Sequence, residues 1–198
     1  MDLDLYKSWN GFADRHDAVA DVLRFFATDG QLLFLALLAA LFFARGKWRS
    51  HNGRHGVAAA GFSALIALGT AQLIATAWDR ARPYEANPSD SHLLLPPSHD
   101  PSFPSDHATG AYAIAVAILL RHRKAGAIAL ILATLVSVSR VGLGTHYPTD
   151  ALGGATLGAL SALLLWAPPI RRPLHRLADR SGQRYERLIH RPGARARS

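Results

Sequence analysis

Five apolar blocks, separated by short charged segments, constrain the fold of this chain more than any other feature of its sequence. The blocks cover residues 30–44, 56–78, 108–120, 125–138 and 151–167. The last four contain no Asp, Glu, Lys or Arg, so they lack the charged face of a helix on the surface of a water-soluble protein. The second block also reaches the roughly 20 residues that a bilayer crossing requires. We therefore predict an all-α integral membrane protein, a bundle of about five transmembrane helices.

The segment before the first block has a different character. Residues 2–27 mix large apolar side chains with many charges, a pattern too polar to span a bilayer but typical of a helix that lies at its surface. We predict a single membrane domain over residues 1–198, with an N-terminal interfacial amphipathic helix in 1–29. The helix bundle then occupies 30–167, and 168–198 forms a basic cytoplasmic tail.

The positive charge of the chain is concentrated in particular loops. The formal net charge is +8, yet the loop 79–106 holds two Lys and Arg against five Asp and Glu, whereas 45–55 holds four against none. Two further segments are basic: 121–124 has three Lys and Arg and no Asp or Glu, and 167–198 has nine Lys and Arg and two Asp and Glu. Positive loops stay on the cytoplasmic side of a membrane. The acidic loop 79–106 and the segment 139–150 are therefore predicted to face the outside.

The segment 139–150 carries reactive side chains where an apolar helix ends and another begins. Pro148 restarts a helix, so Asp150 follows His146 by one helical turn. A carboxylate there can hydrogen-bond one ring nitrogen and leave the other free to attack an electrophile. Arg140 offers a planar fork that suits phosphate oxygens. The alternative is structural: a helix that ends near Arg140 and restarts with a capping Asp150.

The loop 79–106 is predicted to complete an anion site with this segment. It holds six of the eleven prolines and is long for a connection within a bundle, which favours a functional role. Arg82 lies near its start, and Ser105 and His107 lie at its end. Ser105 can also be explained as an ordinary helix N-cap.

Phosphate is the anion that this set of side chains fits best. Phosphoryl transfer needs a nucleophile, an acid for the leaving oxygen and positive charge around the other oxygens. We predict His146 as the nucleophile, His107 as the acid, and Arg82, Ser105 and Arg140 as the phosphate-binding residues. No cluster of metal ligands is apparent in the sequence, so neither a metal nor another cofactor is predicted.

Three motifs in this chain resemble those of the phosphatidic acid phosphatase type 2 superfamily, written K-x6-R-P, P-S-G-H and S-R-x5-H-x3-D. The matching residues are Arg82-Pro83, Pro104-Ser105-Asp106-His107, and Ser139-Arg140 with His146 and Asp150. The resemblance implies a metal-independent phosphatase in which His146 forms a phosphohistidine, Asp150 supports it and His107 protonates the leaving group.

Two positions depart from this family pattern. The lysine expected seven residues before Arg82 is Ala75 here, and we expect Arg80 to supply the missing phosphate contact. The glycine of the second motif is Asp106, which places a carboxylate beside an anion site. That carboxylate should weaken phosphate binding unless it faces an arginine.

The short chain and its Pro-Ser-Asp-His motif look like the bacterial undecaprenyl-pyrophosphate phosphatases. This resemblance implies hydrolysis of undecaprenyl pyrophosphate to undecaprenyl phosphate, lipid-carrier recycling in cell-wall biogenesis, and bacitracin resistance. It also implies a multi-pass protein of the bacterial inner membrane whose active site faces the periplasm or the exterior. The predicted partners are a polyprenyl or other lipid phosphate and the bilayer, without nucleic acid; the oligomeric state is left open.

Other functions are open at this point. The substrate could instead be phosphatidate or phosphatidylglycerol phosphate. From other classes, a small transporter or a nucleic-acid-binding protein acting through the basic tail is conceivable. The charges gather at one predicted face and not within the spans, which argues against a transporter. Vanadium haloperoxidases share the motifs, but the missing lysine and the apolar spans argue against them.

Overall fold

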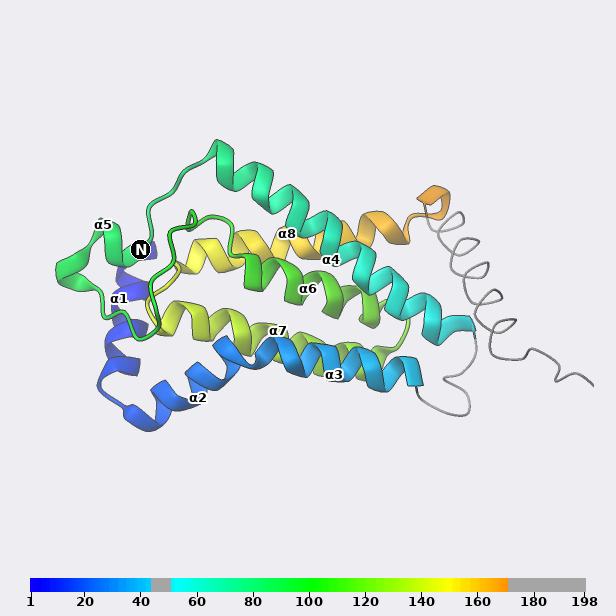
Figure 1. The fold of residues 1–198 in the computed structure, drawn as a ribbon, viewed down its shortest axis with the longest axis horizontal. Coiled ribbons are helices and arrows are strands. Elements are labelled where there is room, and N and C mark those ends of the chain that lie inside the picture. The colour runs from blue at the N-terminus through cyan, green and yellow to red at the C-terminus, as the bar shows by residue number, and fades with distance from the viewer. Residues whose placement is uncertain (44–50, 171–198) are drawn as a thin grey trace, which may run out of the picture.

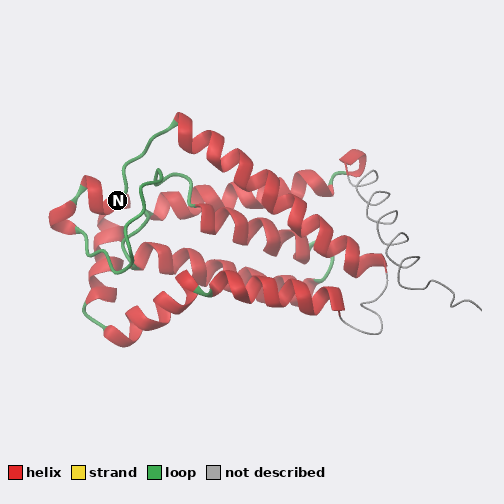
Figure 2. Ribbon diagram, in the orientation of Figure 1, coloured by secondary structure: helices red, strands yellow, loops and turns green. Residues whose placement is uncertain are grey.

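A computed structural model of the protein describes residues 1–43 and 51–170, and within these ranges it contains helices and no strand (Figures 1 and 2). The helices are α1 (Asp2–Asp14), α2 (Asp17–Thr28), α3 (Gly30–Phe43), α4 (His51–Ala77), α5 (Pro83–Ala86), the 3-10 turn η2 (Pro88–Asp90), α6 (Asp106–Leu119), α7 (Arg123–Gly142) and α8 (Pro148–Trp166). The predicted all-α class is confirmed. Residues 45–50 of the predicted positive loop and residues 171–198 of the predicted basic tail lie outside the described residues.

The five predicted apolar blocks correspond to α3, α4, α6, α7 and α8. By length and composition, three helices of the described chain can cross a membrane: residues 56–77 of α4, α7 and α8. A fourth candidate is the pair α2 and α3, which bends by 51° where the two helices meet. Helix α6 has 14 residues, about 21 Å at 1.5 Å per residue, and is shorter than the hydrocarbon core. The protein is a multi-pass membrane protein with three or four candidate spans.

The outer surface of the helices is apolar. Leu65 and Leu73 of α4, Ile131 of α7, and Leu152 and Leu160 of α8 are each more than half exposed. In water such side chains would belong in the core, whereas in a bilayer they contact lipid. The exposed leucines and isoleucines therefore agree with the membrane location predicted from the uncharged blocks.

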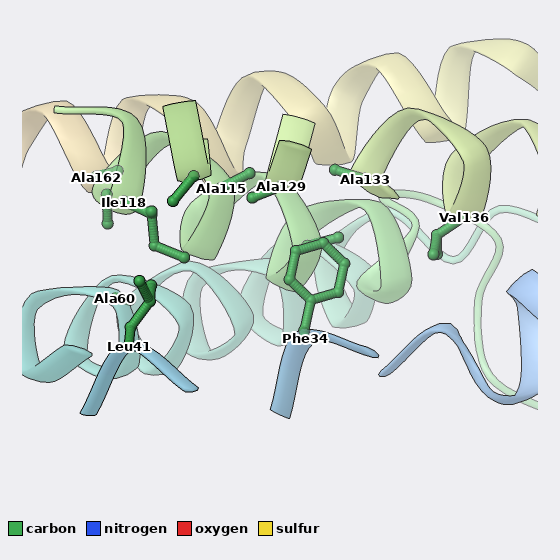
Figure 3. Packing of buried hydrophobic residues seen from close by; sticks show 12 residues of the cluster. Phe34, Leu41, Ala60, Ala115, Ile118, Ala129, Ala133, Val136 and Ala162 are labelled. Carbon is green, nitrogen blue, oxygen red and sulfur yellow. The ribbon is translucent and has the colours of Figure 1, made fainter. Parts of the chain in front are cut away.

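The interior is filled largely by alanine. Helix α6 packs against α4, α7 and α8, and Figure 3 shows Phe34 and Leu41 of α3 among the small side chains of Ala60, Ala115 and Ala129. Small side chains let helix backbones approach closely, which is how helices associate in membranes.

Two glycines set the distance between α6 and α8. A Cβ atom on Gly154 would lie 2.5 Å from the carbonyl oxygen of Ser105, and one on Gly158 would collide with the carbonyl oxygen of Thr109 and lie 2.8 Å from the Ala113 nitrogen. Glycine at these two positions therefore allows α6 and α8 to pack closely. Because α6 and α8 both begin at the same end of the bundle, their contact brings their N-termini together.

One end of the bundle carries the predicted site residues. The connection from α4 to α6 and the corner between α7 and α8 lie at the left end of Figure 1, whereas the turn from α6 to α7 lies at the right end. Helix α1 crosses the left end and buries Tyr6, Asn10 and Ala13. The N-terminal segment thus covers the corner that holds His146; its position at a membrane surface stays a prediction.

Candidate active site

His146 lies in the corner between α7 and α8 with its side chain almost fully buried. The corner turns at Gly144, whose φ of 85° is in the left-handed region that glycine adopts most readily. The Nδ1 atom of His146 lies 2.8 Å from the carbonyl oxygen of Ser102. A carbonyl oxygen can only accept, so Nδ1 carries the proton and Nε2 keeps its lone pair.

Asp150 lies behind His146 in the first turn of α8 and is fully buried. Its Oδ2 atom is 3.8 Å from His146 Nδ1, beyond hydrogen-bond distance. The same oxygen accepts hydrogen bonds from the backbone N–H of Tyr147 at 2.8 Å and from Ser102 Oγ at 2.5 Å. Asp150 therefore caps α8, as the structural alternative required, and also faces the histidine.

Ser102 is a site residue that sequence reasoning missed. It is fully buried, and it joins the two others because its carbonyl oxygen accepts from His146 while its hydroxyl donates to Asp150. No motif contains it, and its contact with His146 is made by the backbone, which is the same in every residue type. No signal in this sequence pointed to it.

Arg82 lies beside the free nitrogen of His146. Its Nη1 atom is 3.5 Å from His146 Nε2 and donates to the carbonyl oxygen of Thr145 at 3.1 Å. Its Nε atom donates to the carbonyl oxygen of Asp100 at 2.8 Å, and the residue is 5% exposed. The guanidinium is therefore held in a fixed orientation next to the nitrogen that carries the lone pair.

Arg140 and Ser105 each present a donor without a partner. Within the part of the chain that the structure describes, the Nε atom of Arg140 and the hydroxyl of Ser105 are buried and make no hydrogen bond. Ser105 occupies the N-cap position of α6, as predicted, but its hydroxyl makes no capping bond. Buried donors usually have partners, so both are available to an anion.

His107 lies in the first turn of α6, between the arginines and an apolar cavity. Its ring lies close enough to the Arg140 and Arg82 guanidiniums for both positive charges to act on it. The cavity, of about 490 Å³, is lined by Gln31, Phe34, Leu35, Ala64, Leu68, Asp106, His107, Gly110, Ala111, Ile114 and Val136. His107 thus borders both the group of positive charges and a space for an apolar substituent.

Asp106, which replaces the glycine of the second motif, lies at the polar end of the same cavity. Its Oδ2 atom accepts a hydrogen bond from Gln72 Nε2 of α4 at 2.8 Å. An amide, rather than the arginine that we considered, is therefore the direct partner of this carboxylate.

The electrostatic surroundings keep His146 neutral. Burial lowers the pKa of His146 below its usual value of 6.5, and the charges of Arg82 and Arg140 lower it further, against the opposing effect of the Asp150 carboxylate. A neutral imidazole is the form that can act as a nucleophile.

Arg80 makes contacts that differ from the phosphate contact that we expected. Its Nη1 atom donates to Asp150 Oδ1 at 2.6 Å, and its Nη2 atom donates to Asp2 Oδ2 at 2.9 Å. Ala75 is buried on α4 and brings no charge to the site. Arg80 is thus engaged with carboxylates of the protein.

The structure brings five of the predicted residues together at one end of the bundle: Arg82, Ser105, His107, Arg140 and His146. Asp150 and Arg80 lie directly behind His146. Within residues 1–43 and 51–170, no group of three or more His, Cys, Asp or Glu side chains is arranged to hold a metal ion.

Comparison with known proteins identifies relatives of this chain. Residues 56–172, more than half of the sequence, match the profile of the PAP2 superfamily. Undecaprenyl-diphosphatase BcrC of Bacillus subtilis is 33% identical over 84% of this chain and 83% of its own length.

Two solved structures are also similar. The crystal structure of Aquifex aeolicus LpxE superposes with a TM-score of 0.62 and 25% identity, covering 82% of this chain and 93% of that protein. A PAP2-type phosphatidylglycerolphosphate phosphatase from Bacillus subtilis superposes with a TM-score of 0.53 and 26% identity, covering 82% and 83%.

Proposed function

Because the chain belongs to the PAP2 superfamily and is a membrane lipid phosphatase, we propose that it hydrolyses undecaprenyl pyrophosphate to undecaprenyl phosphate and inorganic phosphate. The similarity to undecaprenyl-diphosphatase BcrC over most of both chains supports this choice of substrate. The apolar cavity beside His107 supports a substrate with a hydrocarbon chain, since it could receive the first part of that chain.

The observation that carries the proposal is the orientation of His146. Its Nδ1 atom donates to Ser102, so the lone pair of Nε2 is free and lies beside the Arg82 guanidinium. A terminal phosphoryl group bound to Arg82 would lie within reach of this nitrogen. In the first step, Nε2 attacks the terminal phosphorus, the bond to the bridging oxygen breaks, and a phosphohistidine forms.

The remaining residues act on the oxygens of the substrate. Arg82, Arg140 and Ser105 stabilise the negative charge on the terminal phosphoryl oxygens, and the unpartnered donors of Arg140 and Ser105 suit that role. The negative charge of the bound pyrophosphate offsets the positive charges around His107, so His107 takes up a proton and donates it to the bridging oxygen as that oxygen leaves with undecaprenyl phosphate.

Water completes the reaction in a second step. His107, now neutral, accepts a proton from a water molecule that attacks the phosphorus of the phosphohistidine. The nitrogen–phosphorus bond breaks, inorganic phosphate leaves, and neutral His146 is restored. Asp150 supports the positive charge that the imidazole carries while it is phosphorylated.

We further propose that this site faces the periplasm or the exterior of a bacterial inner membrane. The loops at the opposite end include the basic segment 121–124, and positive loops stay in the cytoplasm. Because the sequence contains no cysteine, a single Ser89→Cys substitution at an exposed position of the loop 79–106 would react in intact cells with a thiol reagent that cannot cross the membrane under this orientation.

Release of phosphate from defined lipids by the purified full-length protein tests the proposed function. We expect turnover of undecaprenyl pyrophosphate at least about tenfold above that of phosphatidate or phosphatidylglycerol phosphate, and a loss of at least about 10³-fold in His146→Ala. His92→Ala serves as the control, because His92 is exposed and pairs with Asp14. Activity should persist in excess EDTA. Equal activity of wild type and His146→Ala would contradict the proposal.

Phosphatidylglycerol phosphate is the alternative substrate that a specific observation favours. The similar structure from Bacillus subtilis is described as a phosphatidylglycerolphosphate phosphatase. The same assay separates the two substrates. Faster release of phosphate from phosphatidylglycerol phosphate would make it the preferred substrate and leave the proposed roles of the residues unchanged.

A further inference from the structure

The carboxylate of Asp150 is held by three donors. Ser102 Oγ and the Tyr147 N–H donate to Oδ2, and Arg80 Nη1 donates to Oδ1 at 2.6 Å. Within the described ranges 1–43 and 51–170, Arg80 is the cationic side chain that is hydrogen-bonded to Asp150. A buried carboxylate depends strongly on such a partner, because burial disfavours its charged form.

Arg80 is itself fixed by α1 and by the start of α8. Its Nη2 atom pairs with Asp2 Oδ2 at 2.9 Å, and its Nη1 atom also donates to Thr149 Oγ1 at 2.8 Å. Its guanidinium stacks over the Tyr147 ring at 4.2 Å. The guanidinium is thus bound at both terminal nitrogens and on one face, which leaves it in a single orientation.

Asp2 is joined to the same group by further bonds. It accepts from the Thr149 hydroxyl at 2.6 Å and from the Thr149 N–H at 3.1 Å. Burial raises the pKa of Asp2, but the hydrogen bonds from Thr149 and Arg80 outweigh burial, so the pKa is lowered and Asp2 is charged at neutral pH. Asp2, Arg80 and Asp150 form a line of alternating charge that ends behind His146.

Helix α1 has other anchors on the catalytic corner. The Asn10 side chain is fully buried and donates to the carbonyl oxygens of Gly142 and His92 at 2.9 and 2.8 Å. Tyr6 is fully buried beside Tyr147, with ring centroids 5.6 Å apart. A substitution at Asp2 therefore changes the charge network while these contacts keep α1 in place.

We propose that Arg80 is a positioning residue for the phosphatase reaction, held by Asp2 of α1 so that it keeps the Asp150 carboxylate oriented behind His146. This inference rests on the proposed function, and it makes the N-terminal helix a part of the catalytic apparatus. Asp150 stabilises the imidazole while it carries a phosphoryl group, so loss of Arg80 slows the chemical step without weakening substrate binding.

A phosphate-binding Arg80 would behave in the opposite way. Loss of a phosphate contact raises KM and weakens inhibition by a phosphate analogue such as orthovanadate. Loss of a positioning residue lowers kcat and leaves both of these quantities near their wild-type values.

The pH profile adds a readout that a purely structural role would not change. The titratable groups that face Asp150 are Asp2, Arg80, His146 and Tyr147, and Arg82 and Arg140 lie beyond His146. Without Arg80 to balance its charge, the Asp150 carboxylate raises the pKa of His146 more strongly than before. The acid limb of kcat should therefore move to higher pH in Arg80→Gln.

The test compares Arg80→Gln, Arg80→Lys and Asp2→Asn in the full-length protein. We expect Arg80→Gln to lower kcat by about tenfold or more, with KM and the orthovanadate inhibition constant within about twofold of wild type. The acid limb should move up by about half a pH unit or more. Arg80→Lys should recover part of kcat and of the pH shift, because it retains the charge.

Asp2→Asn tests the contribution of α1. It should lower kcat by about threefold in the wild-type background and by much less in the Arg80→Gln background, because the two residues act through one interaction. Asp4→Asn is the matched control on the same helix, since Asp4 is exposed and pairs with the N-terminal amine; it should leave kcat unchanged.

Three outcomes would overturn the inference. These are a rise in KM and in the orthovanadate constant with unchanged kcat, an unshifted pH profile in Arg80→Gln, and strictly additive effects of the two substitutions. An inactive wild type or an active His146→Ala would instead overturn the proposed function, so the two failures are distinguishable.

Discussion

The Nδ1 atom of His146 lies 2.8 Å from the carbonyl oxygen of Ser102 and 3.8 Å from the carboxylate of Asp150. Ser102 therefore lies between the histidine and the carboxylate in the hydrogen-bond network, because its hydroxyl donates to Asp150. The loop that precedes α6 contacts His146 directly, in addition to connecting two helices.

Ser102→Ala removes the hydroxyl and keeps the carbonyl. We expect kcat to fall about tenfold with KM unchanged, since one hydrogen bond to a charged group contributes roughly 1.5–3 kcal/mol. Phosphate release under saturating substrate measures the effect. Ser91→Ala is the control, because its hydroxyl bonds to the carbonyl oxygen of Pro83, away from His146. An unchanged kcat in Ser102→Ala would show that this bond does not support catalysis.

His107→Ala should lose activity in a way that depends on the leaving group. A lipid phosphate leaves poorly without a proton, so we expect a loss of about 10³-fold on the lipid substrate. Para-nitrophenyl phosphate releases a stable phenolate and should lose less than about tenfold, because its leaving oxygen needs no proton. Steady-state rates on both substrates check this difference. Equal losses on the two would argue against His107 as the acid.

The acid side of the pH profile should report on His146. Burial lowers the pKa of His146 below 6.5, with Arg82 and Arg140 acting in the same direction. A histidine with a lowered pKa stays neutral until the pH falls below that lowered value, so the acid limb of kcat/KM should be centred below pH 6.5. Values of kcat/KM measured across the pH range at constant ionic strength test this direction of the pH dependence. An acid limb centred above pH 6.5 would contradict it.

Gly158→Ala should destabilise the contact between α6 and α8. The added Cβ would meet the backbone of Thr109 and Ala113, which cannot rotate aside, and overpacking of this kind costs about 1–3 kcal/mol. Gly61→Ala is the control, because nothing lies within 4 Å of its added Cβ. Thermal unfolding in detergent should give a lower midpoint for Gly158→Ala only. Equal midpoints would mean that the two helices can separate without cost.

Several features of the fold were predictable because they are local. The absence of charges in the apolar blocks indicates helices in lipid, and each of the five blocks is helical in the structure. The length of α6 was harder to predict, because its first residues, Asp106 and His107, are polar and precede the apolar block 108–120. The N-cap position of Ser105 also follows from residue type, because serine is favoured at helix N-caps.

The candidate site was predictable where spacing along one helix or one motif brings residues together. His146 lies just before α8 and Asp150 lies in its first turn, so a spacing of four residues places them close together, and the motif pairs Ser105 with His107. The roles assigned to these residues stay predictions. The contact expected between His146 and Asp150 is longer than a hydrogen bond, because the loop inserts the Ser102 carbonyl beside Nδ1.

The sequence by itself thus determined the class of the protein and most residues of its candidate site, since apolar blocks and short motifs act over a few residues. The tertiary structure alone decided what surrounds Asp150. Ser102 reaches it across 48 positions, Arg80 across 70, and Asp2 meets Thr149 across 147. No local rule relates such distant residues, because their contact depends on how closely α6 and α8 pack and on where α1 lies over the end of the bundle.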